Sequence, residues 1–167
     1  TTLEELHELI ETVKRTGMTY MMGETSMYYG ARLYCHERFS RGDMGRFVYG
    51  EGEYYHDMSH GFYEAYKYSG GADWKRTAGF PPMLYPTHSL GLLVGVSGER
   101  IVKVSCIGQR VGDDFPEAAE NQYQNPFNNE FALGVTNLGN TCRFAVCWQI
   151  SAEGERALPW DEFITGP

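Results

Sequence analysis

The pattern that most restricts the fold is a pair of alternating apolar runs near the end of the chain. They lie in "EFALGVTNLGNTCRFAVCWQI" (residues 130–150), on either side of an Asn-Leu-Gly-Asn turn at 137–140. Alternation with a period of two is typical of strands that bury one face, and this turn between two such runs indicates a β-hairpin. "RIVKVSCIGQ" (100–109) alternates in the same way. The sequence therefore predicts a sheet that is mostly antiparallel.

An amphipathic helix opens the chain. In "TTLEELHELIETVKRTG" (1–17), Thr2 and Glu5 form a T-x-x-E capping box, and Gly17 is typical of a helix end. Apolar side chains recur at helical spacing along this run, at Leu3, Leu6, Ile10 and Val13. "MTYMMGE" (18–24) is predicted to follow as a short buried strand. A helix that feeds a strand is a unit of an α/β layer, and another strand normally precedes it.

A second helix and a long strand are expected next. Ser26 is the predicted N-cap of a helix that runs to Gly42. Residues 44–57 then alternate as a strand, with one face formed by Phe47, Tyr49, Glu51, Glu53 and Tyr55. The polar and aromatic segment 58–79 is predicted to be a long loop, and loops of that length in a compact domain are often functional.

The predicted order of elements defines the fold class. A helix is expected from Pro86 to Gly98, with proline at its start and glycine at its end. Residues 112–130 are predicted to be a loop, and "ERALPW" (155–160) to begin a last strand. The order α-β-α-β-loop-α-β-β-β favours the α+β class, with an open, mostly antiparallel sheet and helices packed on one face.

The size and charge of the chain exclude several kinds of protein. A length of 167 residues suits a single domain over 1–167. Fourteen basic and 22 acidic residues give a net charge of −8, and an acidic chain without a Lys/Arg run is not expected to bind nucleic acid. No apolar run approaches the roughly 20 residues of a membrane span, and nothing resembles a signal peptide. We therefore expect a cytoplasmic protein without a membrane partner. The first residue is Thr, not Met, so we expect a piece of a longer protein.

The spacing of the cysteines predicts free, reduced thiols and no metal site. Cys35, Cys106, Cys142 and Cys147 form no C-x-x-C pair, and the last three lie in predicted strands with apolar neighbours. Such residues are usually buried and reduced in a cytosolic protein. The sequence gives no support to a zinc site built from them.

Several segments together resemble the C-terminal part of the Gfo/Idh/MocA oxidoreductases. Residues 1–17 resemble the helix that follows that family's Glu-Lys-Pro motif, and "TYMMGE" the strand that leaves its nucleotide domain. "MYYGARLYCHERFSRGDMGRFVYGEGEYYHD" resembles the helix, glycine-rich turn and first long strand of its substrate domain. "PPMLYPTHSLGLLVGVSG" resembles the helix with the catalytic-site histidine, and "TCRFAVCWQISAEGERA" the late strands. The likeness runs nearly end to end, and its order and spacing make it specific.

The resemblance implies one half of a two-domain enzyme. In that family an N-terminal Rossmann domain binds NAD or NADP, while a C-terminal domain shapes the substrate site and builds the oligomer interface on an open sheet. The C-terminal domain of glyceraldehyde-3-phosphate dehydrogenase is similar in architecture. This chain has no G-x-G-x-x-G motif after a strand and no Glu-Lys-Pro. We therefore expect it to be the substrate-binding and oligomerisation domain, with the Rossmann domain outside this chain and no cofactor bound by this chain alone.

His88 is the predicted catalytic residue. Taken alone, one histidine at a helix start is more often structural, although imidazole suits acid–base chemistry near neutral pH. The resemblance implies that it lies near the nicotinamide and handles the proton of a substrate hydroxyl. Many members carry an aspartate four residues earlier, where this chain has Leu84. Tyr85 is the candidate to supply a hydroxyl instead.

The predicted substrate-binding residues are Glu24, Thr25, Tyr28, Tyr29, His56 and Thr87. The first four follow the strand that the resemblance places at the entrance to the cleft, although a helix cap with aromatic packing explains them equally well. His56, Asp57 and His60 are metal-ligand types, but a strand end does not force them onto one face, so no metal is expected. Aromatic residues crowd the same region and suit sugar rings as well as plain packing: Tyr54, Tyr55, Tyr63, Tyr66, Tyr68 and Trp74. Sheet packing or an interface is expected for Arg143, Trp148, Glu155 and Arg156.

Three hypotheses for function remain open on the sequence. The leading one is the C-terminal domain of an oxidoreductase that transfers hydride between NAD(P) and a hydroxyl or ketone of a sugar or polyol, assembled as a homo-oligomer through the sheet. The second is an NAD-dependent glycosidase that acts by oxidation and elimination. The third is a non-catalytic binding or dimerisation module that kept the sheet and lost the chemistry.

Overall fold

A four-stranded open sheet forms the centre of the protein. The computed structural model describes residues 2–56, 62–74, 81–110, 121 and 123–150. The strand order is β1-β4-β3-β2, with β1 parallel to β4 and the other two pairs antiparallel. The bounds are β1 (Tyr49–Tyr55), β2 (Ile101–Gln109), β3 (Asn129–Thr136) and β4 (Thr141–Cys147). The predicted α+β class with an open, mostly antiparallel sheet is confirmed.

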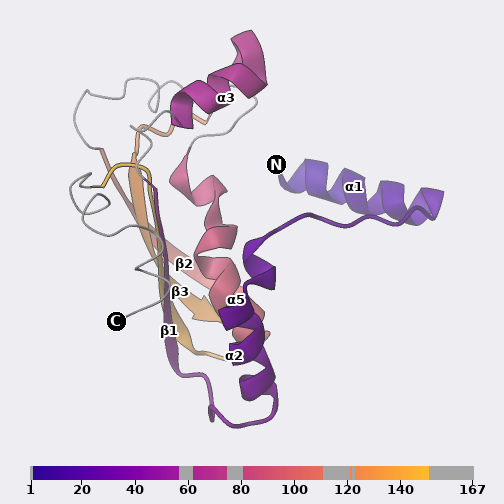
Figure 1. Cartoon of the computed structure of the whole chain (residues 1–167), viewed down its shortest axis with the longest axis vertical. Helices are drawn as coiled ribbons and strands as arrows, with labels where there is room; N and C mark the ends of the chain where they lie inside the picture. The colour runs from indigo at the N-terminus through magenta and orange to yellow at the C-terminus, as the bar shows by residue number, and fades with distance from the viewer. Residues whose placement is uncertain (1, 57–61, 75–80, 111–120, 122, 151–167) are drawn as a thin grey trace.

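Helices cover one face of this sheet, as predicted. Figure 1 shows α5 lying against the sheet with α2 beside it, while α3 lies near one end and α1 projects away. The α-helices are α1 (Leu3–Thr16), α2 (Gly30–Ser40), α3 (Phe62–Gly70) and α5 (Leu90–Ser97). Short 3₁₀ helices are η1 (Ser26–Tyr28), η2 (Gly71–Asp73), η3 (Pro82–Leu84) and η4 (Pro86–His88).

The predicted hairpin forms between β3 and β4. Gly139 adopts a φ of 85°, which glycine tolerates far better than other residues. The Thr136 backbone N–H donates to the Asn140 carbonyl at 2.8 Å, and the Thr136 hydroxyl accepts from the backbone N–H of Leu138 and of Asn140. The turn sets the register in which Ala132 faces Phe144. These two residues form the core with Cys142, against Met83, Leu90, Leu93 and Ile101.

Glycine lets α5 approach β1 closely. A Cβ atom added at Gly52 would lie 2.5 Å from the carbonyl oxygen of Ser89, and one at Gly50 would lie 2.9 Å from the Leu93 side chain. The neighbour of residue 52 is backbone that cannot move aside, so this position needs glycine, whereas the Leu93 side chain next to residue 50 can shift. Gly52 and Ser89 are both buried. The close contact places the start of α5 directly over β1.

A buried carboxylate ties the segment before α5 to the sheet. Glu130 on β3 is only 5% exposed, and its Oε2 atom accepts from the Met83 backbone N–H at 2.6 Å. Its Oε1 atom accepts from the Asn125 amide at 2.7 Å. A buried carboxylate with a donor on each oxygen is satisfied. Glu130 therefore anchors η3 to β3.

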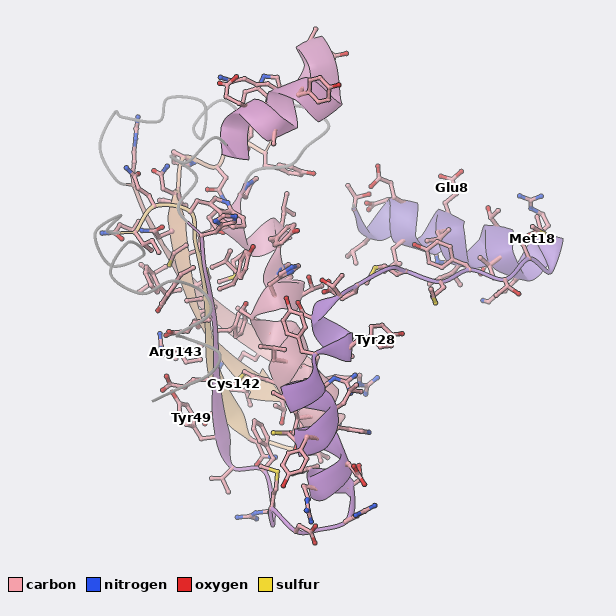
Figure 2. All side chains as sticks on the ribbon, viewed as in Figure 1. Glu8, Met18, Tyr28, Tyr49, Cys142 and Arg143 are labelled. Carbon is pink, nitrogen blue, oxygen red and sulfur yellow. The ribbon has the colours of Figure 1, made fainter. Side chains whose placement is uncertain are left out.

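The opening helix forms as predicted, but its apolar stripe is not covered. The capping box is present, with Glu5 N–H donating to the Thr2 hydroxyl at 3.2 Å and Thr2 N–H donating to Glu5 Oε2 at 2.7 Å. No residue of α1 is buried, and Leu3 is 80% exposed. Figure 2 shows Glu8 and Met18 on the part of the chain that projects from the body.

The short buried strand predicted over 18–24 is wrong. The segment has no regular secondary structure, and Met18, Tyr20, Met21 and Met22 are all exposed. A strand needs a neighbouring strand to bond its backbone groups, and none of the described strands lies beside this segment. The apolar composition indicated burial, but burial requires a partner.

Two further boundaries differ from the prediction. Ser26 does not cap α2: it begins η1, and α2 starts at Gly30 after Tyr29, which makes no side-chain cap. The predicted loop at 58–79 contains α3 and η2 within its described part. The predicted last strand at 155–160 lies outside the described residues.

The cysteines are all thiols, and two of the expected three are buried. Cys142 and Cys147 are buried, whereas Cys106 is exposed because it lies on the edge strand β2 beyond the helices. Among the described residues, no helix is long and apolar enough to cross a bilayer.

Substitution of Gly52 tests the close approach of α5 to β1. We expect G52A to lower the free energy of unfolding by about 1–3 kcal/mol, because the new methyl group would meet backbone and not a side chain that can move. Urea denaturation measures the change. The matched control is G30A in α2, where a Cβ meets nothing within 4 Å. The control should leave stability unchanged or raise it by up to about 1 kcal/mol. Equal stability of G52A and the parent protein would contradict this account.

Removal of the Glu130 carboxylate tests the anchor of η3. We expect E130A to cost about 1–3 kcal/mol, because the Met83 N–H and the Asn125 amide both lose their acceptor. E64A is the control, since Glu64 is exposed and pairs with Lys67 on the same helix. It should stay within about 0.5 kcal/mol of the parent. An equal loss of stability in E130A and E64A would show that the buried contacts of Glu130 contribute no more stability than an exposed ion pair.

Candidate functional site

An aromatic cluster surrounds His88 at the start of α5. The ring centroid of His88 lies 4.4 Å from that of Tyr85 and 4.7 Å from that of Tyr54. Trp148 meets both tyrosines edge-on, at 5.9 Å from Tyr54 and 5.7 Å from Tyr85. Such spacings are those of favourable aromatic pairs. We call these four residues, Tyr54, Tyr85, His88 and Trp148, the aromatic wall. Its rings are flat, and one of them is the imidazole of His88.

Three segments that are distant in sequence build this wall. Tyr54 lies on β1, and its ring points to the helical side of the sheet because it shares the face of Gly52. Trp148 follows β4, where its backbone N–H donates to the Asn128 backbone carbonyl at 2.9 Å. Tyr85 and His88 come from the 3₁₀ turns, in which Pro82 and Pro86 occupy first-turn positions. Anchoring of η3 by Glu130 therefore also positions Tyr85.

Polar groups lie beside the His88 ring. The Thr87 hydroxyl oxygen lies 3.2 Å from His88 Nδ1. Glu24 Oε1 accepts from the Ser26 backbone N–H at 2.7 Å, and Ser26 is fully buried. The carboxylate is thus held in place next to the turn that bears His88.

The surroundings of Glu24 favour its charged form. Burial alone raises the pKa of this carboxyl group. Polar interaction with Thr87, hydrogen bonding from Ser26 and attraction to the His88 ring together outweigh burial and hold the pKa of Glu24 below its ordinary value. The group is therefore ionised at neutral pH.

The predicted site residues fall into two groups. The structure brings together His88, Tyr85, Thr87 and Glu24, with His56 near their edge, where its ring lies 5.9 Å from that of Tyr54. Thr25, Tyr28 and Tyr29 are exposed and do not belong to the aromatic cluster around His88. Figure 2 shows Tyr28 on the side of η1 that faces away from the sheet.

Sequence reasoning missed two important members of the cluster. Trp148 was expected in sheet packing or an interface, yet it is 5% exposed and touches both tyrosines. Tyr54 appeared only as one of several aromatic residues near the loop. The signal for Tyr54 is its place in the alternation of β1, on the same face as Gly50 and Gly52.

The described part of the chain holds no candidate metal site, and three of its cysteines have raised pKa values. No group of three or more His, Cys, Asp or Glu side chains there could hold a metal ion. Asp57 and His60 lie outside the described residues. Burial raises the pKa of Cys147 to about 12 and also raises the pKa of Cys106 and Cys142, so these thiols stay protonated at neutral pH.

A separate pocket lies between α2, α5 and the chain that enters β1. Its volume is about 610 Å³, and its lining is mostly apolar, including Phe39, Phe47, Leu93 and Val96. His88 does not line it. The pocket is therefore distinct from the aromatic cluster.

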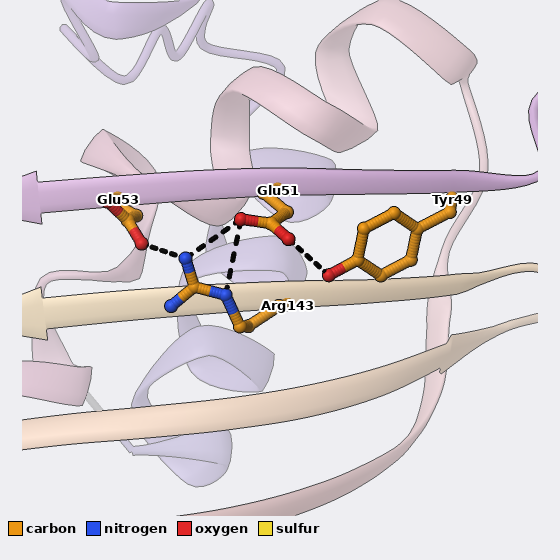
Figure 3. A network of polar contacts seen from close by, with 4 residues as sticks. All are labelled: Tyr49, Glu51, Glu53 and Arg143. Atoms are coloured by element: carbon orange, nitrogen blue, oxygen red, sulfur yellow. Dashed lines mark hydrogen bonds and ion pairs between the residues drawn. The ribbon is translucent and has the colours of Figure 1, made fainter.

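The opposite face of the sheet carries a charged network. Arg143 on β4 bonds Glu51 at 2.8 Å and also pairs with Glu53, while the Tyr49 hydroxyl donates to Glu51 at 2.5 Å (Figure 3). Hydrogen bonds from Arg143 and Tyr49 lower the pKa of Glu51. The network stands on the face that α5 does not cover, beside the exposed side chain of Leu133.

Comparisons with known proteins show similarity to two kinds of enzyme. No protein-family model matches the sequence. Among curated proteins, a glycosyl hydrolase family 109 protein of Saccharopolyspora erythraea is 29% identical over 111 aligned residues. That match covers 63% of this chain and 24% of the other protein, so the chain spans about a quarter of that relative's length.

Solved structures of inositol dehydrogenases share the fold. Myo-inositol 2-dehydrogenase from Lactobacillus plantarum matches with a TM-score of 0.66 and 17% identity, over 89% of this chain and 41% of that chain. Scyllo-inositol dehydrogenase from Lactobacillus casei, solved with NAD(H) and scyllo-inositol, has a TM-score of 0.66 and 12% identity, with 89% and 41% covered. An inositol dehydrogenase homologue from Azotobacter vinelandii, in complex with NADH and myo-inositol, has the same TM-score and 17% identity, with 90% and 36% covered.

The chain spans only part of the length of these dehydrogenases. It accounts for about two fifths of each of the three structures, while almost all of its own length is matched. This agrees with the predicted resemblance to a Gfo/Idh/MocA C-terminal domain. In its fold, the chain is similar to part of each of these inositol dehydrogenases.

Proposed function

We propose that this chain is the substrate-binding domain of an NAD(P)-dependent oxidoreductase of the Gfo/Idh/MocA family. The substrate would be a sugar or a polyol, oxidised at a hydroxyl group or reduced at the corresponding ketone. The observation that supports this most is the position of His88 in an aromatic wall, on a fold shared with inositol dehydrogenases.

The wall suits a polyol ring and an acid–base step. Flat aromatic faces pack well against the C–H faces of cyclic polyols, and a few polar groups fix their orientation. His88 would exchange the proton of the reacting hydroxyl, because imidazole changes its charge near neutral pH. The Tyr85 hydroxyl belongs to a ring 4.4 Å from that of His88 and would hydrogen-bond the same substrate. His56 would contact the substrate at the edge of the wall.

The uncovered N-terminal segment supports a neighbouring domain. Leu3, Leu6 and Ile10 of the α1 stripe and residues 18–23 are exposed, although the apolar composition of both segments favours burial. A Rossmann domain would cover both and would bind most of the NAD or NADP. The cofactor, when bound, supplies the hydride acceptor or donor. This chain would then contribute the proton-transfer group and the substrate wall.

Two wider properties belong to the same proposal. A cytoplasmic location is supported by four cysteines that all remain thiols, as in a reducing compartment. A homo-oligomer is supported by the face of the sheet that helices do not cover. On that face Leu133 is 61% exposed and Ile107 is 75% exposed, next to the network of Arg143 with Glu51. A second copy of the chain would bury these side chains.

A charge on the open face tests the oligomer. We expect the protein to self-associate and L133E to shift it toward the monomer, because the new carboxylate would have to be desolvated at the interface. Sedimentation equilibrium measures the mass. L138E is the matched control, since Leu138 is also exposed, at 70%, but lies in the β3–β4 turn. A monomeric parent protein, or an equal effect of both substitutions, would contradict the proposed interface.

Replacement of His88 tests the catalytic role. In the protein that contains this chain together with its cofactor domain, we expect H88Q to lower kcat by about 10²–10⁴-fold, the usual contribution of a general acid–base group. The assay follows NAD(P)H formation with a panel of inositols and hexoses. H36Q is the control, because His36 lies on α2 and its ring bonds the Val96 carbonyl. Unchanged turnover in H88Q would contradict the role of His88.

The products separate the dehydrogenase from the glycosidase. The likeness to a glycosyl hydrolase family 109 protein is the specific reason to test the second activity. Net NAD(P)H formation from a free polyol or sugar supports the dehydrogenase. Release of a sugar from a glycoside without net NAD(P)H would favour the glycosidase. The absence of both activities, with a folded protein, would favour a binding module without chemistry.

A further inference from the structure

The pocket between α2 and α5 has the size of a small-molecule site. Its volume of about 610 Å³ lies within the range of roughly 300–1,000 Å³ that is typical of ligand pockets. The two helices form two of its walls, and residues 44–49 form another. The helices lie side by side (Figure 1), and His36 Nδ1 on α2 lies 3.2 Å from the Val96 carbonyl oxygen on α5. The walls are therefore held together without a ligand.

Apolar side chains line the pocket and remain in contact with solvent. Met44 and Val48 are exposed, although both are apolar. Phe39, Phe47 and Val96 are half-buried around the same space. Exposed apolar side chains that gather at one place mark a binding surface. A ligand with an apolar body would remove these side chains from water.

Two arginines give this apolar pocket a positive charge. Arg32 comes from α2, and Arg46 belongs to the chain that leads into β1. Neither forms an ion pair with a carboxylate in the described part of the chain. Arg38, Arg41 and Arg143, in contrast, each pair with a carboxylate. In a chain with 22 acidic and 14 basic residues, two such arginines at one pocket favour an anionic ligand.

A glycine of α5 makes room for the Arg32 guanidinium. A Cβ atom added at Gly95 would lie 2.9 Å from Arg32 Nε and 3.2 Å from the Met27 side chain. Gly95 is buried, and the Nε atom of Arg32 is buried without a hydrogen-bond partner among the described residues. A buried donor that lacks an acceptor costs free energy. A carboxylate can bond a guanidinium through two parallel hydrogen bonds and would supply acceptors at this place.

We propose that this pocket is a second binding site, for an organic carboxylate with an apolar body. The carboxylate would bond Arg32, while Arg46, which is exposed, would add electrostatic attraction. The carbon skeleton would pack on Phe39 and Phe47. No residue of the aromatic wall lines the pocket, so this site is separate from the proposed substrate site and does not depend on the reaction catalysed there.

Binding of decanoate to the full-length protein that contains this chain tests the class of ligand. Isothermal titration calorimetry compares decanoate, below its micellar concentration, with decanol, which has the same carbon chain and no charge. We expect decanoate to bind at least about 10-fold more tightly, because hydrogen bonds between two charged groups are stronger than neutral ones. Equal affinity for the two compounds would overturn the proposal.

Substitution of the arginines locates the bound carboxylate. We expect R32Q to raise the Kd of decanoate by about 10–100-fold, and R46Q by about 2–5-fold because Arg46 is exposed. R41Q is the matched control, since Arg41 follows α2, pairs with Glu37 and does not line the pocket. It removes the same charge and should leave the Kd unchanged. An equal loss of affinity in R32Q and R41Q would contradict the assigned site.

Cys35 provides a readout that needs no substitution. This thiol lines the pocket and is half-buried, whereas Cys106 is exposed on β2 and does not line it. Alkylation by iodoacetamide, followed by mass spectrometry of the two peptides, gives both rates in one sample. Decanoate should slow the alkylation of Cys35 severalfold and leave that of Cys106 unchanged.

This protection experiment decides the question even if R32Q fails to fold. Cys35 that reacts equally fast with and without decanoate would overturn the proposal and would favour a protein segment as the occupant of the pocket. Equal protection of Cys35 and Cys106 would overturn it as well, because the compound would then bind without preference for this pocket.

Discussion

The close approach of the Ser89 backbone to Gly52 is the constraint on which the candidate site depends. A side chain at residue 52 would occupy the space of the Ser89 carbonyl, so only glycine allows α5 to begin there. That contact sets the depth at which the η4 turn lies over β1. It brings His88 to within 4.7 Å of Tyr54, two residues further along the strand. The position of the η4 turn over the sheet therefore depends on this one backbone contact.

Local sequence patterns predicted most of the fold because their causes are local. The capping box at Thr2 needs only the next turn of helix, and the Gly139 turn needs only its own hairpin. The segment 18–24 failed for the opposite reason: a strand exists only beside another strand. The helix α3 was not predicted, because the polar and aromatic composition of its segment favoured a loop.

The same difference between local and tertiary causes explains why only part of the candidate site could be predicted. Tyr85, Thr87 and His88 are neighbours in the chain, so their proximity needed no tertiary knowledge. Trp148 and Tyr54 join them only because β1 pairs with β4 and ends level with it. Glu24 was recognised as polar and well placed, but its partner was not foreseen. The resemblance points to a carboxylate at the position of Leu84, whereas the carboxylate near His88 in this structure is that of Glu24.

The parallel pairing of β1 with β4 has a consequence for the order of folding. Strands β2, β3 and β4 form an antiparallel meander, and β3 and β4 are joined by a tight turn. The contact of Glu51 with Arg143 instead spans 92 residues of chain. Long-range contacts close late because chain entropy must be lost before they form. We expect β1 to dock last on a preformed meander, and the wall around His88 to be completed only in that final step.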